Sequence, residues 1–377
     1  MKILIAPDKF KHCLTARQVA GNLSRGINRV LPDAEIVIVP MADGGEGTVQ
    51  AMVDATKGSF IKTSVNNPLM QPVEAVYGIT GSGDTAVIEM SAASGLALLK
   101  EEERNPWKTT TFGTGELIKH ALDNHCRKII IGIGGSATND AGAGMAEALG
   151  YKFTDKNGQP IPKGGGGLLQ VQNIDTSAVD NRIFHTEMLV ACDVNNPLTG
   201  ENGASMVYAR QKGADEDLVQ ELEKNLIHFS NIIRQQLNSD VTEIPGAGAA
   251  GGLGAGMMAF CKAQLKPGFQ VIAETINLEK QIKNADLVIT GEGKLDIQTQ
   301  YGKTPFGVAQ IARQHQKKVI AIGGTLSGDA GDLYNHGFDL LLPIIERPVK
   351  LEEAFENAPE FLQNTGERIG RMLKMLL

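Results

Sequence analysis

Several short apolar runs, each ending in a loop-forming cluster, constrain the fold of this chain most. They are rich in Val, Ile and Leu and read KILIAPD, EIVIVPMADGG, KIIIGIGGSATND, MLVACDVNNP, DLVITGEGKLD, VIAIGGT and DLLLPII. Their apolar positions are continuous rather than alternating, which is typical of strands buried on both faces, as in parallel sheets. The sequence therefore predicts an α/β protein built on parallel sheets.

Amphipathic helices are predicted between some of these strands. Residues 16–30 carry an apolar stripe, and Thr15 with Gln18 fits a capping box at the start of that helix. The same periodicity predicts helices over residues 218–237 and 305–315, and a packed helix over the last twenty residues. The first helix lies between two apolar runs, so residues 2–40 form a strand, helix and strand unit.

The hydrophobic pattern of the sequence changes between residues 61 and 90. IKTSVNN, PVEAVYGIT and TAVIEM are short, partly alternating and separated by turn clusters, which predicts an antiparallel meander. The two ends of the chain thus resemble each other, and the middle differs. We expect a discontinuous Rossmann-like parallel-sheet domain made of residues 1–45 and 265–377, and an inserted mixed α/β domain of residues 46–264.

Composition narrows the class of function. A formal net charge of −7, without a run of Lys and Arg, argues against nucleic-acid binding. No segment reads as a signal peptide, and the longest low-charge run is shorter than the ~20 residues of a membrane span, so we expect a cytoplasmic protein with no membrane partner. The four cysteines are far apart, which predicts reduced thiols rather than a zinc site or disulfides.

Acidic or amide side chains follow many of the predicted strands. In open α/β sheets, ligands bind outside the carboxyl ends of the strands. Singly, each such residue is more often a helix cap or a turn residue, but together they suggest a divalent cation such as Mg²⁺, which takes one or two carboxylates plus phosphate oxygens and water. These residues are Asp8, Asp43, Glu46, Asn139, Asp140, Asp193, Glu292 and Asp296.

Glycine-rich turns supply a complementary feature. The chain has 44 glycines, and they cluster in residues 132–144, 245–256 and 290–305. Backbone N–H groups in such turns can form a nest for phosphate oxygens, particularly where a helix follows. Lys9, Lys294 and Lys303 lie nearby in sequence. Acidic metal ligands, glycine-rich turns and lysines together are the groups that a phosphoryl-transfer site requires.

Known phosphate and dinucleotide motifs match only partly. Gly302, Lys303 and Thr304 match the end of a P-loop, but Ile297 occupies the position of its first glycine, so that motif fails. Residues 132–137 read GIGGSA and fit G-x-G-x-x-A, and Asp155 lies where a ribose-binding acid would be. This weak match leaves an NAD(P)-dependent oxidoreductase acting on a small hydroxy acid as an alternative, beside a non-catalytic sugar-acid binding protein.

Longer motifs, in a fixed order over essentially the whole chain, resemble the type I glycerate kinase family. They are APDKFKHCLTA, PMADGGEGT, TTTFGTGELI, GIGGSATNDAGAGM, ACDVNNPLTGENGA, QKGA, PGAGAAGGLGAG and GEGKLDIQTQYGKTPFGVA. The resemblance implies ATP-dependent phosphorylation of D-glycerate with Mg²⁺, favouring 2-phosphoglycerate over 3-phosphoglycerate. It also implies two α/β domains with the active site in the cleft between them, and it leaves the oligomeric state open.

Residue roles follow as hypotheses from this chemistry. Catalysis is assigned to Asp193, Asp296, Lys11 and Lys303, and Mg²⁺ to Asp193, Glu292 and Asp296. Substrate binding is assigned to Asp8, Asp43, Gly44, Gly45, Glu46, Ser136 and Asn139, and nucleotide binding to Gly134, Gly135, Gly248, Gly251 and Gly252. The carboxylates would hold the metal or deprotonate the attacking hydroxyl, and the lysines would offset phosphate or glycerate charge.

The first loop departs from the family pattern. The family usually reads Asp-Ser-Phe-Lys-Gly-Ser there, whereas this chain has DKFKHC from Asp8 to Cys13. Lys9, His12 and Cys13 are the differing positions. The resemblance therefore carries over no role of the family's serine in this loop to this chain.

Overall fold

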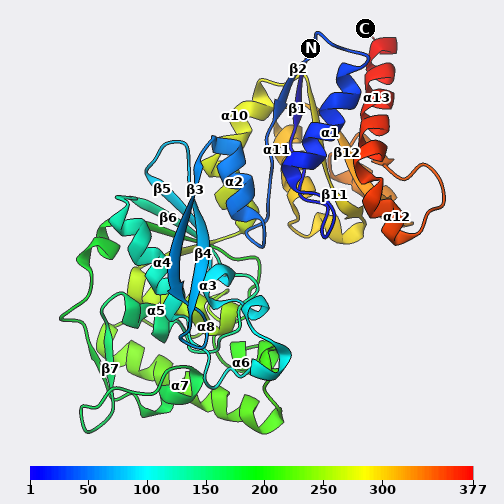
Figure 1. Ribbon diagram of the computed structural model, residues 1–377. Helices are drawn as coiled ribbons and strands as arrows, with labels where there is room; N and C mark the ends of the chain where they lie inside the picture. Colours follow the sequence, from blue (N-terminus) through cyan, green and yellow to red (C-terminus); the bar gives the residue numbers. More distant parts are fainter. Residues whose placement is uncertain (377) are drawn as a thin grey trace. The chain divides into compact units, whose positions relative to one another are not determined.

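The computed structural model describes residues 1–376, which divide into two compact units (Figure 1). Unit 1 comprises Met1–Asp43, Gln50–Lys57 and the chain from Phe269 onward, and unit 2 comprises Gly44–Val49 and Gly58–Gly268. The sequence places the boundaries near residues 45 and 265, and the structure adds residues 50–57 to unit 1. Helix α2 (Thr48–Thr56) contains the second changeover.

Unit 1 is built on a five-stranded, fully parallel sheet in the order β13-β12-β11-β1-β2. Its strands are β1 (Lys2–Ile5), β2 (Glu35–Ile38), β11 (Leu287–Leu295), β12 (Lys318–Leu326) and β13 (Leu340–Pro343). Its helices are α1 (Ala16–Asn28), α9 (Gly268–Thr275), α10 (Leu278–Lys283), α11 (Thr304–Gln314), α12 (Leu351–Glu356) and α13 (Ala358–Leu376), with 3₁₀ turns at Ile297–Gln300 and Ala330–His336.

Helices α1 and α13 lie side by side against one face of this sheet (Figure 1). Their apolar stripes pack on alternate strand residues such as Ile3 and Ile5. The two backbones approach closely at Gly26, where a Cβ would lie 1.9 Å from the carbonyl oxygen of Gln363. The predicted capping box of α1 is confirmed, because Thr15 and Gln18 exchange hydrogen bonds.

Two expectations for unit 1 need correction. The run EIVIVPM predicts a strand buried on both faces, but β2 is an edge strand and Ile38 is 37% exposed. The strand predicted for DLVITG does not end at Gly291. Strand β11 continues to Leu295 because it keeps its pairing with β12, for example Lys294 with Thr325. Glu292 therefore lies in the extended end of a strand rather than in a loop.

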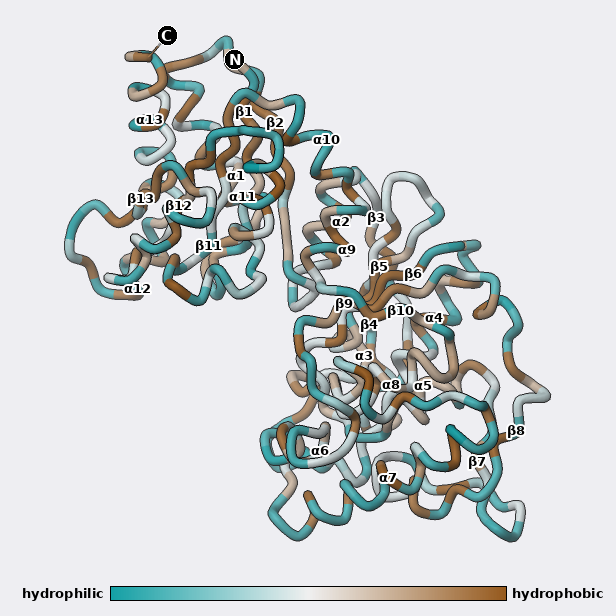
Figure 2. Tube along the Cα trace, turned by 180° about the vertical axis from the view of Figure 1, so that it is seen from behind, coloured by the Kyte–Doolittle hydropathy of each residue, from teal (hydrophilic) through white to brown (hydrophobic). Residues whose placement is uncertain are grey.

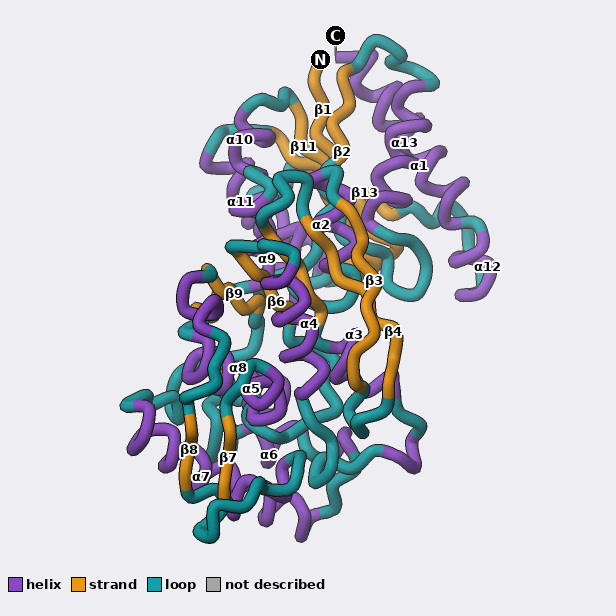
Figure 3. Tube along the Cα trace, turned by 60° about the vertical axis from the view of Figure 1, so that its left-hand side comes forward, coloured by secondary structure: helices purple, strands orange, loops and turns teal. Residues whose placement is uncertain are grey.

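Unit 2 contains a six-stranded mixed sheet in the order β10-β9-β6-β5-β4-β3. The meander predicted for residues 61–90 is confirmed, because β3, β4 and β5 pair antiparallel, while β5, β6, β9 and β10 pair parallel. The strands are β3 (Ser59–Asn66), β4 (Pro72–Ile79), β5 (Thr85–Glu89), β6 (Lys128–Gly132), β9 (Glu187–Ala191) and β10 (Gln264–Lys266). A separate two-stranded sheet joins β7 (Lys152–Thr154) to β8 (Asn173–Asp175) (Figure 3).

Helices surround the core of unit 2. They are α3 (Ser91–Ser94), α4 (Phe112–Asp123), α5 (Ala143–Ala148), α6 (Ala204–Tyr208), α7 (Glu216–Leu237) and α8 (Ala249–Cys261), with 3₁₀ turns at Leu96–Leu98, Glu101–Glu103, Gly165–Gln170, Asn181–His185 and Arg210–Lys212. In each unit the central strands are hydrophobic (Figure 2). The predicted α/β class and the helices expected over 16–30, 218–237, 305–315 and the C-terminal end are confirmed. Within residues 1–376, no helix combines the length and hydrophobicity needed to cross a bilayer.

Candidate active site

The connections of unit 1 create a crevice between β1 and β11. From β1 the chain passes through α1 to β2, on one side of the sheet order, and from β11 it passes through α11 to β12, on the other side. Outgoing connections that diverge from neighbouring parallel strands leave room for a ligand outside the strands' carboxyl ends. The loop after β1 and the end of β11 therefore form the natural binding position of this unit.

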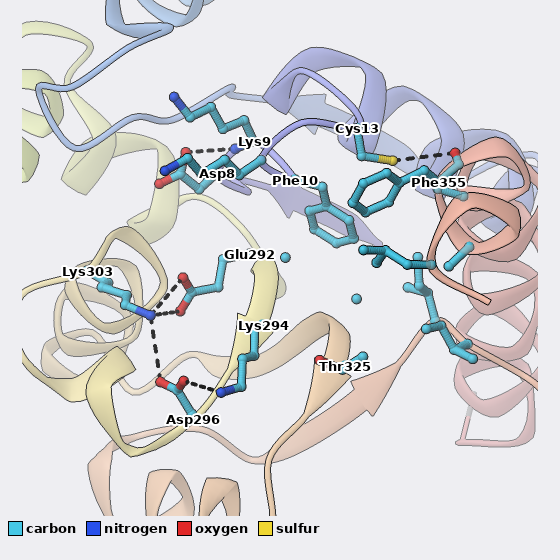
Figure 4. Close-up of a pocket in the computed structure, with 18 of the residues that line it drawn as sticks. Asp8, Lys9, Phe10, Cys13, Glu292, Lys294, Asp296, Lys303, Thr325 and Phe355 are labelled. Carbon is cyan, nitrogen blue, oxygen red and sulfur yellow. Dashed lines mark hydrogen bonds and ion pairs between the residues drawn. The ribbon is translucent and has the colours of Figure 1, made fainter. Parts of the chain in front are cut away.

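A pocket of about 410 Å³ occupies this position (Figure 4). The loop after β1, the ends of β11 and β12, the segment after β13 and helix α12 all contribute to its lining. The lining residues are Asp8, Lys9, Phe10, Lys11, Cys13, Asp43, Glu292, Gly293, Lys294, Asp296, Lys303, Gly324, Thr325, Ile344, Ile345, Leu351, Ala354, Phe355 and Ala358. Eight residues that the sequence analysis singles out thus line one pocket: Asp8, Lys11, Asp43, Glu292, Asp296 and Lys303, with Lys9 and Lys294 from the wider inventory.

Asp8 is held at the carboxyl end of β1. Its backbone N–H donates to the carbonyl of Gly291 at 2.8 Å, and its carboxylate accepts from Thr304 Oγ1 at 2.8 Å and from the Lys9 N–H at 2.7 Å. Burial and, after it, the charge of Asp43 raise the pKa of Asp8 to about 7, against the opposing contacts with Thr304 and Lys9. A carboxyl group with a pKa near neutrality is suited to accept a proton during catalysis.

Glu292, Asp296 and Lys303 form a charged cluster beside Asp8 (Figure 4). Lys303 Nζ lies 3.3 Å from Glu292 Oε2 and 3.6 Å from Asp296 Oδ1, and Lys294 Nζ lies 3.1 Å from Asp296 Oδ2. Asp296 also caps the following 3₁₀ turn by accepting from the Gln298 N–H. The cluster is therefore held both by ion pairs and by backbone contacts.

The surroundings shift the pKa values of the two carboxylates of this cluster in opposite directions. Burial raises the pKa of Glu292, against the hydrogen bond from Thr299 and the charge of Lys303. Burial also opposes ionisation of Asp296, but Lys294 and Lys303 together hold the pKa of Asp296 below its usual value. Asp296 is therefore the group that stays ionised, and the Glu292 carboxylate takes up a proton more readily.

Lys303 immediately precedes α11, whose first residues are Thr304 and Pro305. The start of an eleven-residue helix presents unpaired N–H groups and a partial positive charge, which favour a phosphate. The partial P-loop match at Gly302 to Thr304 thus places a lysine and a hydroxyl residue at a helix N-terminus, as a P-loop does. The Thr304 hydroxyl, however, already donates a hydrogen bond to the Asp8 carboxylate.

The donor set of this crevice suits Mg²⁺ bound together with a nucleotide. Hard carboxylate oxygens of Glu292 and Asp296 lie within reach of one lysine, and Mg²⁺ commonly uses one or two carboxylates beside phosphate oxygens and water. Among the described residues 1–376, no group of three or more His, Cys, Asp or Glu side chains forms a metal cage on its own. Asp193, the third predicted ligand, belongs to unit 2. The Mg²⁺ assignment therefore stays a prediction.

The departures in the first loop have local structural consequences. His12 has φ 62°, a left-handed conformation that glycine adopts without strain, which explains why glycine is usual at this position in the family pattern. Cys13 Sγ donates to the carbonyl oxygen of Phe355 at 3.5 Å and so contacts α12. Lys11, the other predicted catalytic lysine, is exposed and lines the pocket.

The loop from Asp43 to Thr48 contains the changeover from unit 1 to unit 2. Gly44 has φ 94° and is buried, and a Cβ there would lie 2.7 Å from Ala191 Cβ, so this glycine is required by packing. Gly45 O accepts from Thr48 Oγ1 at 2.6 Å, which closes the turn, and Glu46 is exposed. Substrate contacts of Asp43, Gly44, Gly45 and Glu46 stay predictions.

In unit 2, the turn after β6 exposes Gly134 and Gly135 beside a buried Ser136. A Cβ at Gly134 would have Gly45 Cα, 3.7 Å away, as its near neighbour, so this turn is open rather than packed. No helix follows directly, because α5 begins only at Ala143. That spacing removes the helix N-terminus that a dinucleotide fingerprint needs, and Asp155 instead accepts from Asn157 and Gln159 in its own turn.

Lys212 is the functional candidate that the sequence does not reveal. Its side chain is 1% exposed, and Nζ donates to Ser136 Oγ and to the carbonyl of Thr138, both at 2.8 Å. Burial lowers the pKa of Lys212 to about 7, against the attraction of Asp140. Because Lys212 donates to Ser136 Oγ, the hydroxyl hydrogen of Ser136 is directed elsewhere. Lys212 lies in the QKGA motif, but nothing in that motif links it to Ser136.

Residues 138–140 have a structural role. Asp140 is fully buried and accepts from the N–H groups of Thr111, Gly142 and Gly144 and from the hydroxyls of Thr110 and Thr111. Asn139 is also fully buried and donates from Nδ2 to Ser205 Oγ at 3.0 Å. The substrate contact of Asn139 stays a prediction, and Asp140 organises the backbone around this residue.

Gly248, Gly251 and Gly252 are buried at the start of α8. A Cβ at Gly251 would lie 1.9 Å from the Thr138 carbonyl oxygen, and one at Gly248 would lie 2.1 Å from the Pro197 carbonyl oxygen. The N–H of Gly248 already donates to the carbonyl of Asn196, and the N–H of Gly252 donates to the carbonyl of Gly248. Close packing accounts for these glycines, and their nucleotide contact stays a prediction.

Asp193 follows β9 and is exposed. Its Oδ1 accepts from the N–H of Gly268, the first residue of α9, at 2.8 Å. This contact is of the kind that caps a helix, and helix capping is the more common role of a single acidic residue after a strand. Its catalytic and metal-binding roles stay predictions.

Asp8→Asn should stabilise unit 1 while impairing its site. With a pKa of about 7 when folded and an ordinary carboxyl pKa when unfolded, Asp8 disfavours folding as the pH rises from the unfolded value through 7. We expect Asp8→Asn to raise the free energy of unfolding by about 1–2 kcal/mol near pH 8, and by less near pH 6. Denaturant unfolding at both pH values measures this, with the exposed Asp329→Asn as control; equal effects at the two pH values would contradict it.

Comparisons with known proteins agree with this architecture. The model of the glycerate kinase family matches residues 3–374. A glycerate kinase of Halalkalibacterium halodurans is 50% identical over 367 residues, covering 97% of each chain, and a glycerate 2-kinase of Escherichia coli is 48% identical over 373 residues, covering 99% of this chain and 98% of the relative. A crystal structure from Salmonella typhimurium, described as a candidate glycerate kinase 2, matches with a TM-score of 0.93 and 46% identity, covering 100% of this chain and 98% of that one. The chain therefore belongs to the glycerate kinase family and is a phosphotransferase.

Proposed function

We propose that this protein transfers the γ-phosphoryl group of ATP to D-glycerate, at the 2-hydroxyl, to give 2-phosphoglycerate and ADP. The observation that carries the proposal is the crevice between β1 and β11, where Asp8, the Glu292–Asp296 pair and Lys303 converge beside the start of α11. The glycerate 2-kinase of Escherichia coli, 48% identical to this chain, supports the choice of hydroxyl.

Each group has a defined task in such a transfer. The Asp8 carboxylate, with its pKa of about 7, accepts the proton of the attacking hydroxyl as that oxygen bonds to the γ-phosphorus. The bond from the γ-phosphorus to the bridging oxygen breaks, and ADP leaves. Lys303 and the N-terminus of α11 offset the negative charge of the transferred group.

Glu292 and Asp296 would hold Mg²⁺ with the nucleotide phosphates, and the ion would supply further charge neutralisation. In unit 2, the open turn at Gly134 and Gly135, with Ser136 oriented by Lys212, offers donors to an anionic group of a substrate. Since ATP is the phosphoryl donor, the reaction is expected in the cytoplasm.

A coupled assay of ADP release tests the proposal. We expect release to depend on both D-glycerate and Mg²⁺, to be slower with L-glycerate and other small hydroxy acids, and to yield a product whose ³¹P NMR signal is that of 2-phosphoglycerate. ADP release that is indifferent to every hydroxy acid would refute the kinase assignment, and a 3-phosphoglycerate signal would refute the regiochemistry alone. An absorbance change with NAD(P) and a hydroxy acid would instead favour an oxidoreductase.

A further inference from the structure

The crevice pocket has two ends of different chemistry. One end carries the charged side chains of Asp8, Glu292, Asp296 and Lys303, and the other carries Phe10, Ile344, Ile345, Leu351, Ala354 and Phe355. In Figure 4 the rings of Phe10 and Phe355 lie together, away from Lys303 and Asp296. The proposed reaction uses only the charged end, so the apolar end has no assigned role.

The apolar end is not formed by core packing alone. Phe10 is buried in the core of unit 1, but Phe355 is 39% exposed and Leu351 is 64% exposed, both on the short helix α12. Burying such side chains under a ligand is favourable, at roughly 25 cal/mol for each Å² of apolar surface removed from water. The pocket therefore presents an apolar wall that a ligand of matching chemistry would cover.

Glycerate does not match this wall. Every carbon of glycerate carries oxygen, so burying it against Phe355 and Leu351 would strip water from polar groups without returning hydrogen bonds. A nucleotide matches both ends, because its phosphates are anionic and its base is flat and has an apolar face. A pocket of about 410 Å³ falls within the range of small-molecule and cofactor sites.

We propose that the apolar end, with Phe355 as its exposed aromatic wall, binds the purine base of the nucleotide, while the phosphates extend towards Lys303. This rests on the proposed function for the presence of a nucleotide, and it goes further by assigning the base. The loop after β1 and α12 are joined across this end by the contact of Cys13 Sγ with the Phe355 carbonyl. In this arrangement the base lies against helix α12, which is not part of the central sheet.

The test compares a nucleotide with a phosphate chain that lacks a base. Binding of Mg²⁺-ADP and of Mg²⁺-tripolyphosphate is measured by calorimetry for the wild type, Phe355→Ala and Phe355→Tyr. We expect Phe355→Ala to weaken ADP binding about tenfold, corresponding to the loss of one base–aromatic contact, and to change tripolyphosphate binding less than about twofold. Phe355→Tyr, which keeps the ring, should restore ADP affinity.

Phe184→Ala is the matched control, because Phe184 is 45% exposed and lies in unit 2. We expect it to bind both ligands as the wild type does. Unchanged ADP affinity in Phe355→Ala, or equal weakening of ADP and tripolyphosphate, would overturn the proposal. These are binding measurements without turnover, so they can succeed or fail independently of the ADP-release assay that tests the kinase function.

A second readout needs no substitution. Cys13 lines the same end of the pocket, and its alkylation can be followed by peptide mass spectrometry at alkaline pH, since burial raises the pKa of this thiol. We expect Mg²⁺-ADP to slow the alkylation of Cys13 at least fivefold, and tripolyphosphate to leave it within about twofold. Equal protection by the two ligands, or none from ADP, would contradict a base at this end even if the Phe355 variants failed to fold.

Discussion

Lys303→Met should lower kcat by about 100- to 1000-fold while leaving the fold intact. Lys303 is the cation shared by Glu292 and Asp296, and it stands at the start of α11, where developing charge on a transferred phosphoryl group would be met. Methionine keeps the length and apolar stem of lysine but removes the ammonium. The loss should therefore appear in the chemical step more than in the binding of glycerate.

The structural alternative for Lys303 is an ordinary ion pair. Its side chain is 35% exposed, and pairs of this kind contribute about 0–1 kcal/mol to stability, so the melting temperature should change little. Lys318→Met is the control, because Lys318 forms an exposed ion pair with Asp339 at the start of β12, the opposite end of the same strands. Steady-state kinetics of both variants decide the matter: comparable kcat values for Lys303→Met and Lys318→Met would remove Lys303 from the mechanism.

Asp140→Ala should destabilise unit 2 by about 3–5 kcal/mol. The fully buried carboxylate accepts from five donors, three of them backbone N–H groups of Thr111, Gly142 and Gly144, and alanine would leave these donors buried without a partner. For a unit of this size the melting temperature should fall by about 6–20 °C. Differential scanning calorimetry measures this fall.

A control for Asp140 is available in the same unit. Asp217 is exposed in the first turn of α7, and Asp217→Ala should change the free energy of unfolding by no more than about 0.5 kcal/mol. If Asp140→Ala were as stable as Asp217→Ala, the carboxylate would not be organising the 138–144 segment. A functional role for Asp140 would then have to be considered again.

Local sequence patterns account for much of the fold. The capping box at Thr15 involves residues three apart, and the apolar stripe of α1 repeats within one helix, so both can be recognised without knowledge of the rest of the chain. The continuous apolar runs likewise indicate buried parallel strands. The exposure of Ile38 could not be foreseen, because strand order decides which strand forms an edge.

The candidate site depends on contacts between distant segments. The strand-end rule selects Asp8, Glu292 and Asp296 from sequence, but the Asp8 contact with Thr304 spans 296 residues and the Lys212 contact with Ser136 spans 76. Glycine-rich sequence also has two physical meanings. It can expose N–H groups, as at Gly134, or it can allow close packing, as at Gly251, and only the surrounding structure distinguishes them.

The central claim is that the nucleotide binds in the crevice between β1 and β11, and amide hydrogen exchange with and without Mg²⁺-ADP tests it most directly. We predict slower exchange in peptides covering residues 8–13, 291–296 and 351–358, which line the pocket. Exchange at the exposed Gly134–Gly135 turn and in residues 246–252 should change less. Protection confined to those glycine segments, with none at 8–13 or 291–296, would contradict the account.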